Sequence, residues 1–385
     1  MRSIGSVARA RNGDIAIRLT WRRIVIGLAA LGSLGVLGAV LFAWLGVYNV
    51  AASVGHFYVV DRFLRFGMES SVEARAPDIE PPDLSDPNLI RLGAGHYYAG
   101  CAYCHGSPDT PISPIARSML PPPPDLRGLE RWTDQELFWL IQNGLKYTGM
   151  PGWPGPSRDD EIWAAVAFLR AIPGLTRAQY TRLALGDVEI PSQDGEEIAT
   201  GDGPSDAVRA CARCHGGGGT GPESDLVPVL HGQPLDMIAQ ALRDYAAGLR
   251  PSGIMRAATS GLTEREITEL ATYYARLAPL EPRGALGGED GDAQRLIAEG
   301  DAARNIPGCV QCHDNRALPL YPRLAGQSAR YLEGRLTAWK AGLRGTSSTD
   351  AIMAPIAARL TSDEIARIAR YFSRQHPHTG EGAVR

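Results

Sequence analysis

The feature that most constrains this chain is a motif of two cysteines and a histidine that occurs three times. The copies read CAYCH (101–105), CARCH (211–215) and CVQCH (309–313), and together they use all six cysteines. The residues are Cys101, Cys104 and His105, then Cys211, Cys214 and His215, then Cys309, Cys312 and His313. In each copy two residues separate the cysteines, so a single helical turn presents both thiols on one side.

This spacing indicates covalent attachment of a c-type haem, with the thiols bonded to its vinyl groups and the histidine bound to its iron. Three other uses of paired cysteines fit less well. A tetracysteine zinc site takes the pairs two at a time and leaves one pair over. A thioredoxin-like pair needs no histidine after it, and a disulfide framework does not require the same spacing three times. We therefore expect three covalently bound haem c groups.

The sequence around the second and third motifs repeats as well, which suggests one structural unit for each motif. The stretch LHGQPLDMIAQALRDYAAGLR (230–250) aligns with LAGQSARYLEGRLTAWKAGLR (324–344) through a shared Gly-Gln pair and a shared AGLR. Pro228 and Pro322 each lie four residues before that glycine. The unit around the first motif is more distant in sequence. We refer to these units as repeat 1 (residues 86–183), repeat 2 (residues 195–279) and repeat 3 (residues 292–376).

A methionine occupies the same position in each repeat. Met150, Met255 and Met353 each lie 12 residues before an isoleucine of the last helix. A thioether as the second axial ligand of a haem iron favours simple electron transfer and raises the reduction potential. Core filling is the usual role of methionine, and Met119 and Met237 are rival ligands, but their positions do not match between repeats. The histidines outside the motifs are interpreted as surface or packing residues: His56, His96, His231, His376 and His378.

Each repeat is expected to contain a helix leading into the motif, a loop, a second helix, a methionine-bearing loop and a last helix. Capping boxes start the last helix in repeats 2 and 3, at Thr263-x-x-Glu266 and Thr361-x-x-Glu364. In repeat 1 Arg158 replaces the threonine, and Ser157 and Asp159 are the expected substitute caps. No strand pattern is convincing. We therefore predict an all-α fold in which each repeat is one domain and the haem supplies much of its core.

The chain begins with a basic segment followed by a long apolar one. The first 23 residues carry six arginines and one aspartate, a net charge of +5, so the remaining chain carries about −8. Residues 24–47 form an apolar run that is longer than the ~7–15 residues of a signal-peptide core. A spanning helix needs ~20 apolar residues, so we predict a retained transmembrane helix at 24–47. A cleaved signal peptide is the competing interpretation.

The positive-inside rule places residues 1–23 in the cytoplasm and all residues after the span on the opposite side of the membrane. Residues 48–85 then form a periplasmic connector. Its end, within APDIEPPDLSDPNL (76–89), is rich in proline, which favours an extended tether. Polar stretches at 186–197 and 278–292 separate the three repeats.

At the family level the chain resembles class I cytochromes c. Repeats 2 and 3 resemble tandem dihaem cytochromes c through the P-x-x-x-G-Q, AGLR and M-x(6)-LT-x-x-E-I patterns. Repeat 1, with PPPPDL (121–126) and ELFWLIQNGLKYTGMPGW (136–153), resembles membrane-anchored monohaem cytochromes found with haem–copper oxidases, as does GVYNVAA (46–52). The resemblance implies a glycine and an aromatic residue before the motif. Repeat 1 has both, Gly93 and Tyr97, whereas repeats 2 and 3 lack the aromatic residue.

These features predict an electron carrier, not an enzyme, tethered to the periplasmic face of a bacterial inner membrane. Electrons would enter from a quinol-oxidising complex or a soluble cytochrome and leave to a terminal haem–copper oxidase, of which the chain is a candidate subunit. The acidic body favours basic docking surfaces on a partner and argues against nucleic-acid binding. The alternative is the cytochrome subunit of a membrane-bound dehydrogenase that passes electrons to quinone. A multihaem peroxidase needs an open sixth iron position, which the three matched methionines argue against.

Overall fold

The computed structural model describes residues 20–108, 110–155, 157–186, 206–282, 290–313, 319–343 and 345–377. The chain divides into two compact units, Met1–His56 and Phe57–Arg385. Parts of several predictions lie outside the described residues: most of the basic N-terminal segment, residues 187–205 and 283–289 between the repeats, Arg344 and His378.

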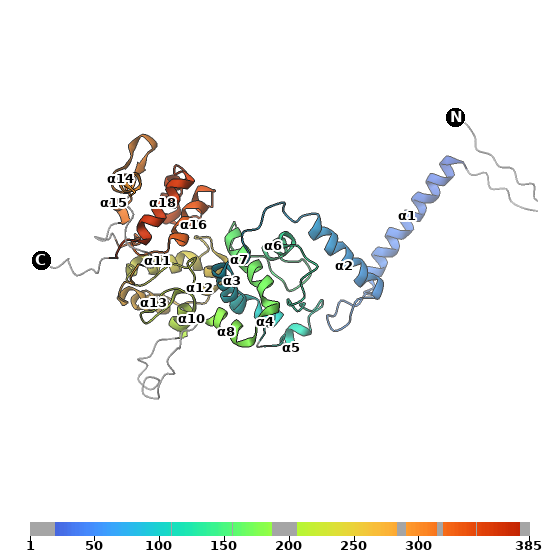
Figure 1. The fold of residues 1–385 in the computed structure, drawn as a ribbon. Coiled ribbons are helices and arrows are strands. Elements are labelled where there is room, and N and C mark those ends of the chain that lie inside the picture. The colour runs from blue at the N-terminus through green and yellow to red at the C-terminus, as the bar shows by residue number, and fades with distance from the viewer. Residues whose placement is uncertain are drawn as a thin grey trace, which may run out of the picture. The chain divides into compact units, whose positions relative to one another are not determined.

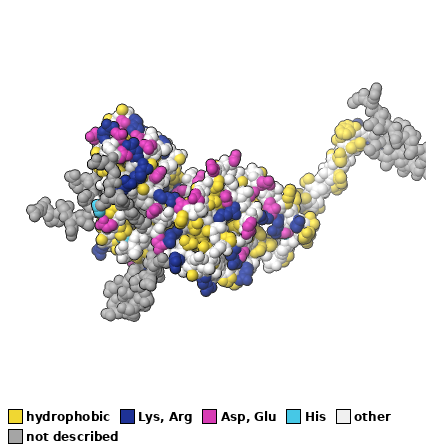
Figure 2. All heavy atoms as spheres, in the orientation of Figure 1, with side chains coloured by type: hydrophobic (Ala, Val, Ile, Leu, Met, Phe, Trp, Pro, Cys, Tyr) yellow, Lys and Arg dark blue, Asp and Glu magenta, His cyan; other side chains and the backbone are white. Residues whose placement is uncertain are grey.

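The first unit contains the helix α1 (Trp21–Trp44). Both of its ends lie three residues before the corresponding ends of the predicted span, residues 24–47. Within the described part of the chain, α1 is the one helix that is long and apolar enough to cross a membrane. None of its residues is buried, and apolar side chains cover its surface (Figure 2). By length and composition, such a helix near the N-terminus suits a membrane anchor or a signal sequence.

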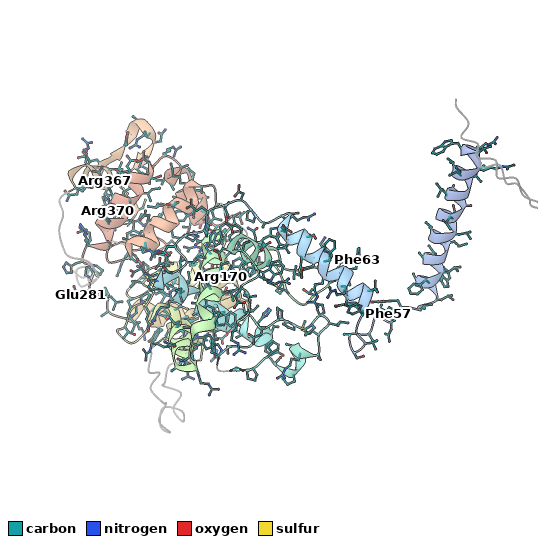
Figure 3. All side chains as sticks on the ribbon, turned by 45° about the vertical axis from the view of Figure 1, so that its right-hand side comes forward. Phe57, Phe63, Arg170, Glu281, Arg367 and Arg370 are labelled. Atoms are coloured by element: carbon teal, nitrogen blue, oxygen red, sulfur yellow. The ribbon has the colours of Figure 1, made fainter. Side chains whose placement is uncertain are left out.

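The predicted connector contains a helix that its proline content did not indicate. Helix α2 (Tyr58–Glu73) precedes the prolines, and its Val72 is buried. Phe57 and Phe63, both labelled in Figure 3, expose more than two thirds of their surface. The assignment of residues 48–85 as a connector stays a prediction, and the helix at residues 58–73 is an element that the sequence analysis did not predict. An extended segment follows only at the prolines, as proline geometry requires.

The second unit is mostly helical, as predicted (Figure 1). Repeat 1 contains α3 (Pro87–Gly100), α4 (Ala102–His105), α5 (Pro114–Arg117), α6 (Asp134–Asn143), α7 (Asp159–Ala171) and the 3₁₀ turn η1 (Ile172–Gly174), with α8 (Arg177–Leu185) after it. Repeat 2 contains α10 (Asp206–His215), α11 (Leu235–Ala246), α12 (Gly253–Thr259) and α13 (Glu264–Arg276). Repeat 3 contains α14 (Gly291–Glu299), η2 (Ala302–Arg304), α15 (Val310–His313), α16 (Ala329–Lys340), α17 (Ser348–Ala357) and α18 (Ser362–Ser373).

One strand pair departs from the all-α expectation. In repeat 3, β1 (Gly300–Asp301) pairs antiparallel with β2 (Ile306–Pro307) just before the motif. Asn305 between them adopts a left-handed backbone conformation with φ 52°, which asparagine tolerates better than most residues. Asn305 lies four residues before Cys309, the position that the aromatic Tyr97 occupies before Cys101 in repeat 1. A short hairpin takes the place of the helical turn there.

Each repeat has its own cluster of buried apolar side chains. The isoleucine that anchors the sequence alignment is buried in all three repeats, as Ile162, Ile267 and Ile365. These residues lie in α7, α13 and α18, the last helix predicted for each repeat. The contacts of Phe57–Arg385 nevertheless join into one compact unit, so the division into three domains stays a prediction.

The predicted capping boxes of repeats 2 and 3 are confirmed. Thr263 and Thr361 each accept a hydrogen bond from the backbone of the glutamate three residues on, and that glutamate bonds back. In repeat 1 the substitute caps are wrong: Arg158 is the N-cap, and no side chain caps the helix. The glutamate at the equivalent position, Glu161, is therefore free to bond elsewhere.

Glu161 instead joins repeat 1 to repeat 2. Its carboxylate is buried and accepts hydrogen bonds from the hydroxyl of Ser252 (2.5 Å) and the amide of Gly253 (2.7 Å), at the start of α12. The Trp153 indole donates to the same carboxylate at 3.1 Å, and the Arg158 guanidinium lies 2.8 Å from it. The negative charge thus caps a helix N-terminus in another repeat, where the helix dipole stabilises it.

Gly93 allows the close approach of α3 and α7. A Cβ atom at this position would collide with the Ala164 carbonyl and lie 2.8 Å from Cβ of Phe168. Glycine is therefore required here for packing, since the helix itself would prefer alanine.

Gly93→Ala is expected to destabilise the second unit by about 2–3 kcal/mol, because one methyl group must force two packed helices apart. Chemical denaturation followed by circular dichroism measures this change. Gly67→Ala on α2 is the matched control, since no heavy atom lies within 4 Å of the added methyl. It should be neutral or stabilise by up to about 1 kcal/mol. Equal effects of the two substitutions would contradict the packing argument.

Glu161→Ala is expected to cost about 3–5 kcal/mol, since it leaves the start of α12 and the Trp153 indole without their acceptor. It also removes one of the two carboxylates that pair with the Arg158 guanidinium, the other being that of Asp160. Thermal and denaturant unfolding report the loss. Glu264→Ala serves as the control, because Glu264 pairs with Arg243 on an exposed surface and such pairs contribute about 0–1 kcal/mol. A cost at position 161 no larger than at 264 would show that the contact between repeats is dispensable.

Candidate functional site

Each cysteine–histidine motif lies on a helical turn. Repeats 1 and 3 form the short helices α4 and α15 there, whereas in repeat 2 the longer α10 runs through the motif. The amide of His105 donates to the Cys101 carbonyl at 2.9 Å, and His313 does the same to Cys309 at 2.9 Å. The turn places the two thiols and the imidazole of one motif on neighbouring positions, as the sequence predicted.

A proline carbonyl holds the histidine of every motif. His105 Nδ1 lies 2.9 Å from the oxygen of Pro124, and the pairs His215–Pro228 and His313–Pro322 are separated by 3.1 Å and 2.9 Å. A carbonyl oxygen only accepts, so Nδ1 must carry the hydrogen and the lone pair is on Nε2. This arrangement fixes the tautomer and ring orientation of a metal-binding histidine.

Burial favours the neutral form of the three motif histidines. Burial lowers the pKa of His105, His215 and His313, although the bond to the proline carbonyl opposes this effect in each case. Neutral imidazole is the form that binds iron. The three prolines were visible in the sequence, Pro228 and Pro322 by their alignment and Pro124 in PPPPDL, but their role as acceptors was missed.

The carbonyl just after the motif is held by a tyrosine in repeats 1 and 2. Tyr97, from the helix before the motif, donates to the Gly106 oxygen at 2.6 Å. Tyr274, from the last helix of repeat 2, donates to the equivalent Gly216 oxygen at 3.0 Å. Repeat 2 lacks an aromatic residue before its motif, and another helix supplies the same hydroxyl. The sequence comparison gave no sign of this substitution, because the two tyrosines are far apart in the alignment.

The cysteines do not resemble redox-active thiols. All six are free in the structure. Burial raises the pKa of Cys101 to about 12 and that of Cys211 and Cys309 to about 11. Reactive thiols have lowered pKa values in electropositive, partly exposed surroundings. The first cysteine of each pair is therefore suited to a structural bond and not to thiol exchange.

One large cavity of about 1080 Å³, the shared cavity, is lined mostly by residues of repeats 2 and 3 and in part by residues of repeat 1, including His96 and Glu161. Its lining includes His215 and His313, and also Met255 and Met353. The volume lies above the ~300–1,000 Å³ of a typical pocket for one small molecule. The structure therefore brings together the four predicted iron ligands of these repeats around a common space. The predicted ligands of repeat 1 are not among its lining residues.

The methionines occupy different local structures. Met150 lies in the loop between α6 and α7, as predicted. Met255 and Met353 lie inside the helices α12 and α17, so the prediction of a loop is wrong in repeats 2 and 3. Serine caps start these helices, at Ser252 and Ser347. All three methionines are partly buried.

The rival methionines also have defined places. The methyl group of Met119 lies against Gly149, directly beside Met150, so the structure brings both candidates of repeat 1 together. Met237 lies on α11 and lines the shared cavity. Sequence position alone distinguished the candidates, and it still favours Met150 and Met255.

Several guanidinium nitrogens of arginines that line the shared cavity lack acceptors, although Arg323 donates through Nη1 to the Gly232 carbonyl. Nε of Arg250, Nε of Arg323, and both Nε and Nη2 of Arg335 are buried without a hydrogen-bond partner among the residues that the structure describes. An unpaired buried guanidinium is costly. Burial and the neighbouring Arg250 lower the pKa of Arg335. A group with carboxylates would satisfy these donors.

The residues therefore fit haem. The fit rests on motif histidines with a free Nε2, a cavity of suitable size in repeats 2 and 3, and orphaned guanidinium donors that suit the two propionates. Sequence reasoning missed the arginines, although Arg250 belongs to the AGLR pattern. Arg335 has no counterpart in repeat 2, where Ala241 aligns with it, so no repeat signal pointed to it.

The remaining described histidines lie in other surroundings, and neither ring nitrogen of His231 has a hydrogen-bond partner among the described residues. Burial lowers the pKa of His96 to about 4, and its ring packs 4.3 Å from that of Trp153. His231 is buried edge-on to Tyr274 at 6.2 Å. His56 bonds the Tyr48 hydroxyl at 2.5 Å, and His376 lies 3.1 Å from the Glu281 carboxylate.

Replacing Met150, Met255 or Met353 singly by alanine is expected to convert one haem to a high-spin form. Each variant should lose about a third of the weak methionine–iron charge-transfer absorption, since each removes one of three equivalent axial bonds. Optical and electron paramagnetic resonance spectra measure both changes. Met119→Leu and Met237→Leu are the controls and should keep the full band. Loss of the band in Met119→Leu would assign the ligand of repeat 1 to Met119 instead.

Comparison with known proteins finds cytochromes that are similar to parts of this chain. A family model described as cytochrome c oxidase, cbb3-type, subunit III, matches residues 88–169 and 199–273. The thiosulfate dehydrogenase electron acceptor of Thiomonas intermedia is 34% identical over 174 residues, 43% of this chain and 78% of that protein. Cytochrome c4 of Pseudomonas aeruginosa is 28% identical over 191 residues, 46% of this chain and 90% of the relative. A solved cytochrome c4 from Acidithiobacillus ferrooxidans is 28% identical and has a TM-score of 0.39. The match covers 43% of this chain and 97% of the cytochrome c4 chain.

Proposed function

The chain belongs to the cytochrome c family, and from this premise we propose that it is a membrane-tethered periplasmic electron carrier with three covalent haems. It is a cytochrome c electron-transfer protein related to cytochrome c4 and to the thiosulfate dehydrogenase electron acceptor. Membership of the family implies covalently bound haem c. The number of haems, the ligands and the partners are the proposal.

One observation carries the number of haems: the same histidine–proline bond occurs in all three repeats. A histidine orientated through Nδ1 by a carbonyl is prepared to bind a metal through Nε2. We assign proximal ligands to His105, His215 and His313, and distal ligands to Met150, Met255 and Met353. We assign the thioether bonds to the haem vinyl groups to the six cysteines of the motifs.

The chain's own residues would prepare each site for electron transfer. When bound, the haem supplies an iron that cycles between ferrous and ferric states. The motif turn fixes the plane of attachment, and the proline carbonyl fixes the orientation of the imidazole. In the shared cavity, Arg250 and Arg335 offer donors to propionates and would shield their charge from the interior. Electron transfer of this kind makes and breaks no bond in a substrate. The protein is therefore proposed as a carrier and not as an enzyme.

The first candidate partner is a terminal haem–copper oxidase. The family model that matches repeats 1 and 2 is described as a subunit of such an oxidase. Repeat 1 also carries the sequence features that resemble oxidase-associated monohaem cytochromes. Electrons would arrive from a quinol-oxidising complex or a soluble cytochrome, and the chain would act beside the oxidase or as its subunit.

The second candidate partner is a dehydrogenase. Two relatives, each 34% identical, are named thiosulfate dehydrogenase electron acceptor. In this case the chain would accept the electrons that a dehydrogenase releases when it oxidises thiosulfate. The alternative given by the sequence, the cytochrome subunit of a membrane-bound dehydrogenase, would also take electrons from a dehydrogenase. The names of these two relatives favour thiosulfate as the source of those electrons.

The location proposed is the periplasmic face of a bacterial inner membrane, with residues 1–23 in the cytoplasm. The helix α1 supports an anchor by its length and composition. The excess of arginine before it supports the orientation.

The purified full chain is expected to contain three haems per polypeptide by pyridine haemochromogen assay and iron analysis. Membranes solubilised in mild detergent then identify the partner by what co-purifies with the chain. A haem–copper oxidase that oxidises the reduced chain rapidly supports the first candidate. A thiosulfate dehydrogenase that reduces it supports the second.

The salt dependence of the association rate provides a second test of the proposed partner. Since the body of the chain is acidic, the association rate with a basic partner should fall steeply as ionic strength rises. Stopped-flow mixing at several salt concentrations measures this. Fewer than three haems, or a mature protein without α1, would overturn the corresponding part of the proposal.

A further inference from the structure

Two buried glutamines link repeats 2 and 3 in a reciprocal way. Gln233 and Gln327 are 4% and 5% exposed and belong to the P-x-x-x-G-Q pattern that both repeats share. Each side chain bonds to a backbone residue of the opposite repeat. The proposed electron transfer gives these glutamines no role, although they occupy equivalent positions in the two repeats.

The bonds have matching geometry on the two sides. Gln327 accepts from the Val229 amide at 3.0 Å and donates to the Val229 carbonyl at 2.5 Å. Gln233 accepts from the Arg323 amide at 2.9 Å and donates to the Arg323 carbonyl at 2.9 Å. Val229 and Arg323 are equivalent in the repeat alignment, as are the two glutamines. The contact is therefore symmetric. Gln327 of repeat 3 holds Val229 of repeat 2, and Gln233 of repeat 2 holds Arg323 of repeat 3.

The clamped amide belongs to the peptide group that holds the motif histidine. The Pro228 carbonyl, which accepts from His215, and the Val229 amide are the two ends of one peptide. In repeat 3 the Pro322 carbonyl, which accepts from His313, shares its peptide with the Arg323 amide. Donation by the amide of a peptide polarises that peptide and strengthens its carbonyl as an acceptor. The glutamine therefore acts on the histidine through one shared peptide group.

We propose that each glutamine tunes the haem of the opposite repeat: Gln327 that of repeat 2, and Gln233 that of repeat 3. This rests on the proposed haem ligation by His215 and His313. A stronger bond at Nδ1 makes the imidazole a better electron donor, which stabilises ferric iron and lowers the reduction potential. The two glutamines are positioning residues, because they reach the iron only through the proline peptide and the histidine.

Repeat 1 provides an internal comparison. Its motif histidine bonds Pro124, and a glycine again follows four residues later, at Gly128. The next residue is Leu129 and not glutamine, and its side chain is buried in the core of repeat 1. Repeat 1 thus keeps the proline acceptor and the glycine but has a leucine in place of the clamping side chain. Its haem should respond to neither glutamine.

The test is redox titration of the full holoprotein carrying Gln327→Leu or Gln233→Leu, with haem methyl proton resonances assigned to each repeat. Gln327→Leu should raise the potential of the haem in repeat 2, and Gln233→Leu that of the haem in repeat 3. The expected change is roughly two- to five-fold in the ferric-to-ferrous equilibrium, about 20–40 mV at 59 mV per tenfold. The Nδ1 proton resonance of the affected histidine should shift in the same variant.

Two control variants separate tuning from loss of the contact between repeats. Ser328→Ala removes another bond from repeat 3 to repeat 2, that of its hydroxyl to the Asp225 carbonyl at 2.6 Å, without touching either proline peptide. It should shift no haem. Gln327→Glu keeps an acceptor for the Val229 amide, so it should not raise the potential of repeat 2, and it remains informative if the leucine variant does not fold.

A shift confined to the repeat that carries the substitution would overturn the inference, as would an equal shift of all three haems or no shift in a folded variant. These outcomes differ from failure of the proposed function. A protein with fewer than three haems would lack a redox wave in the unsubstituted chain, whereas three waves without the crossed pattern would refute only the role of the glutamines.

Discussion

The bond between a motif histidine and a proline carbonyl is the interaction on which the sites depend. It fixes which ring nitrogen can bind iron, and it ties the motif turn to a loop that lies 9 to 19 residues further along the chain. The interval varies while the bond stays constant. Loops of different length can therefore form the same kind of site, provided that one proline carbonyl lies within hydrogen-bond distance of Nδ1 of the motif histidine.

The contacts between repeats involve the same regions that carry the predicted ligands. Glu161 caps the helix of Met255 from repeat 1, and the two glutamines connect the proline peptides of repeats 2 and 3. Buried polar groups of this kind are stable only when every partner is in place. In the proposed carrier, electron transfer between haems would require fixed separations, and contacts that fix the segments of the predicted ligands would serve this need.

Much of the local architecture could be predicted. The helices, the capping boxes at Thr263 and Thr361 and the buried isoleucines follow from spacing within a short stretch of chain. Errors arose where a local rule was overridden. The sequence analysis predicted neither α2, which lies before the prolines, nor the start of α7, where Arg158 is the N-cap and Glu161 bonds to another repeat. Met255 and Met353 lie on helices because serine caps start those helices just before them.

The sequence by itself determined how many haem attachment motifs the chain has and which residues form them, because covalent attachment needs neighbouring residues at fixed spacing. It also determined the repeat, since equivalent positions can be aligned without knowing how they pack. Only the tertiary structure decided which carbonyl holds each histidine, which tyrosine bonds the following glycine and which arginines are left without acceptors. It also decided that each glutamine reaches the opposite repeat. These are contacts between residues distant in sequence, and their partners depend on packing, which no local spacing specifies.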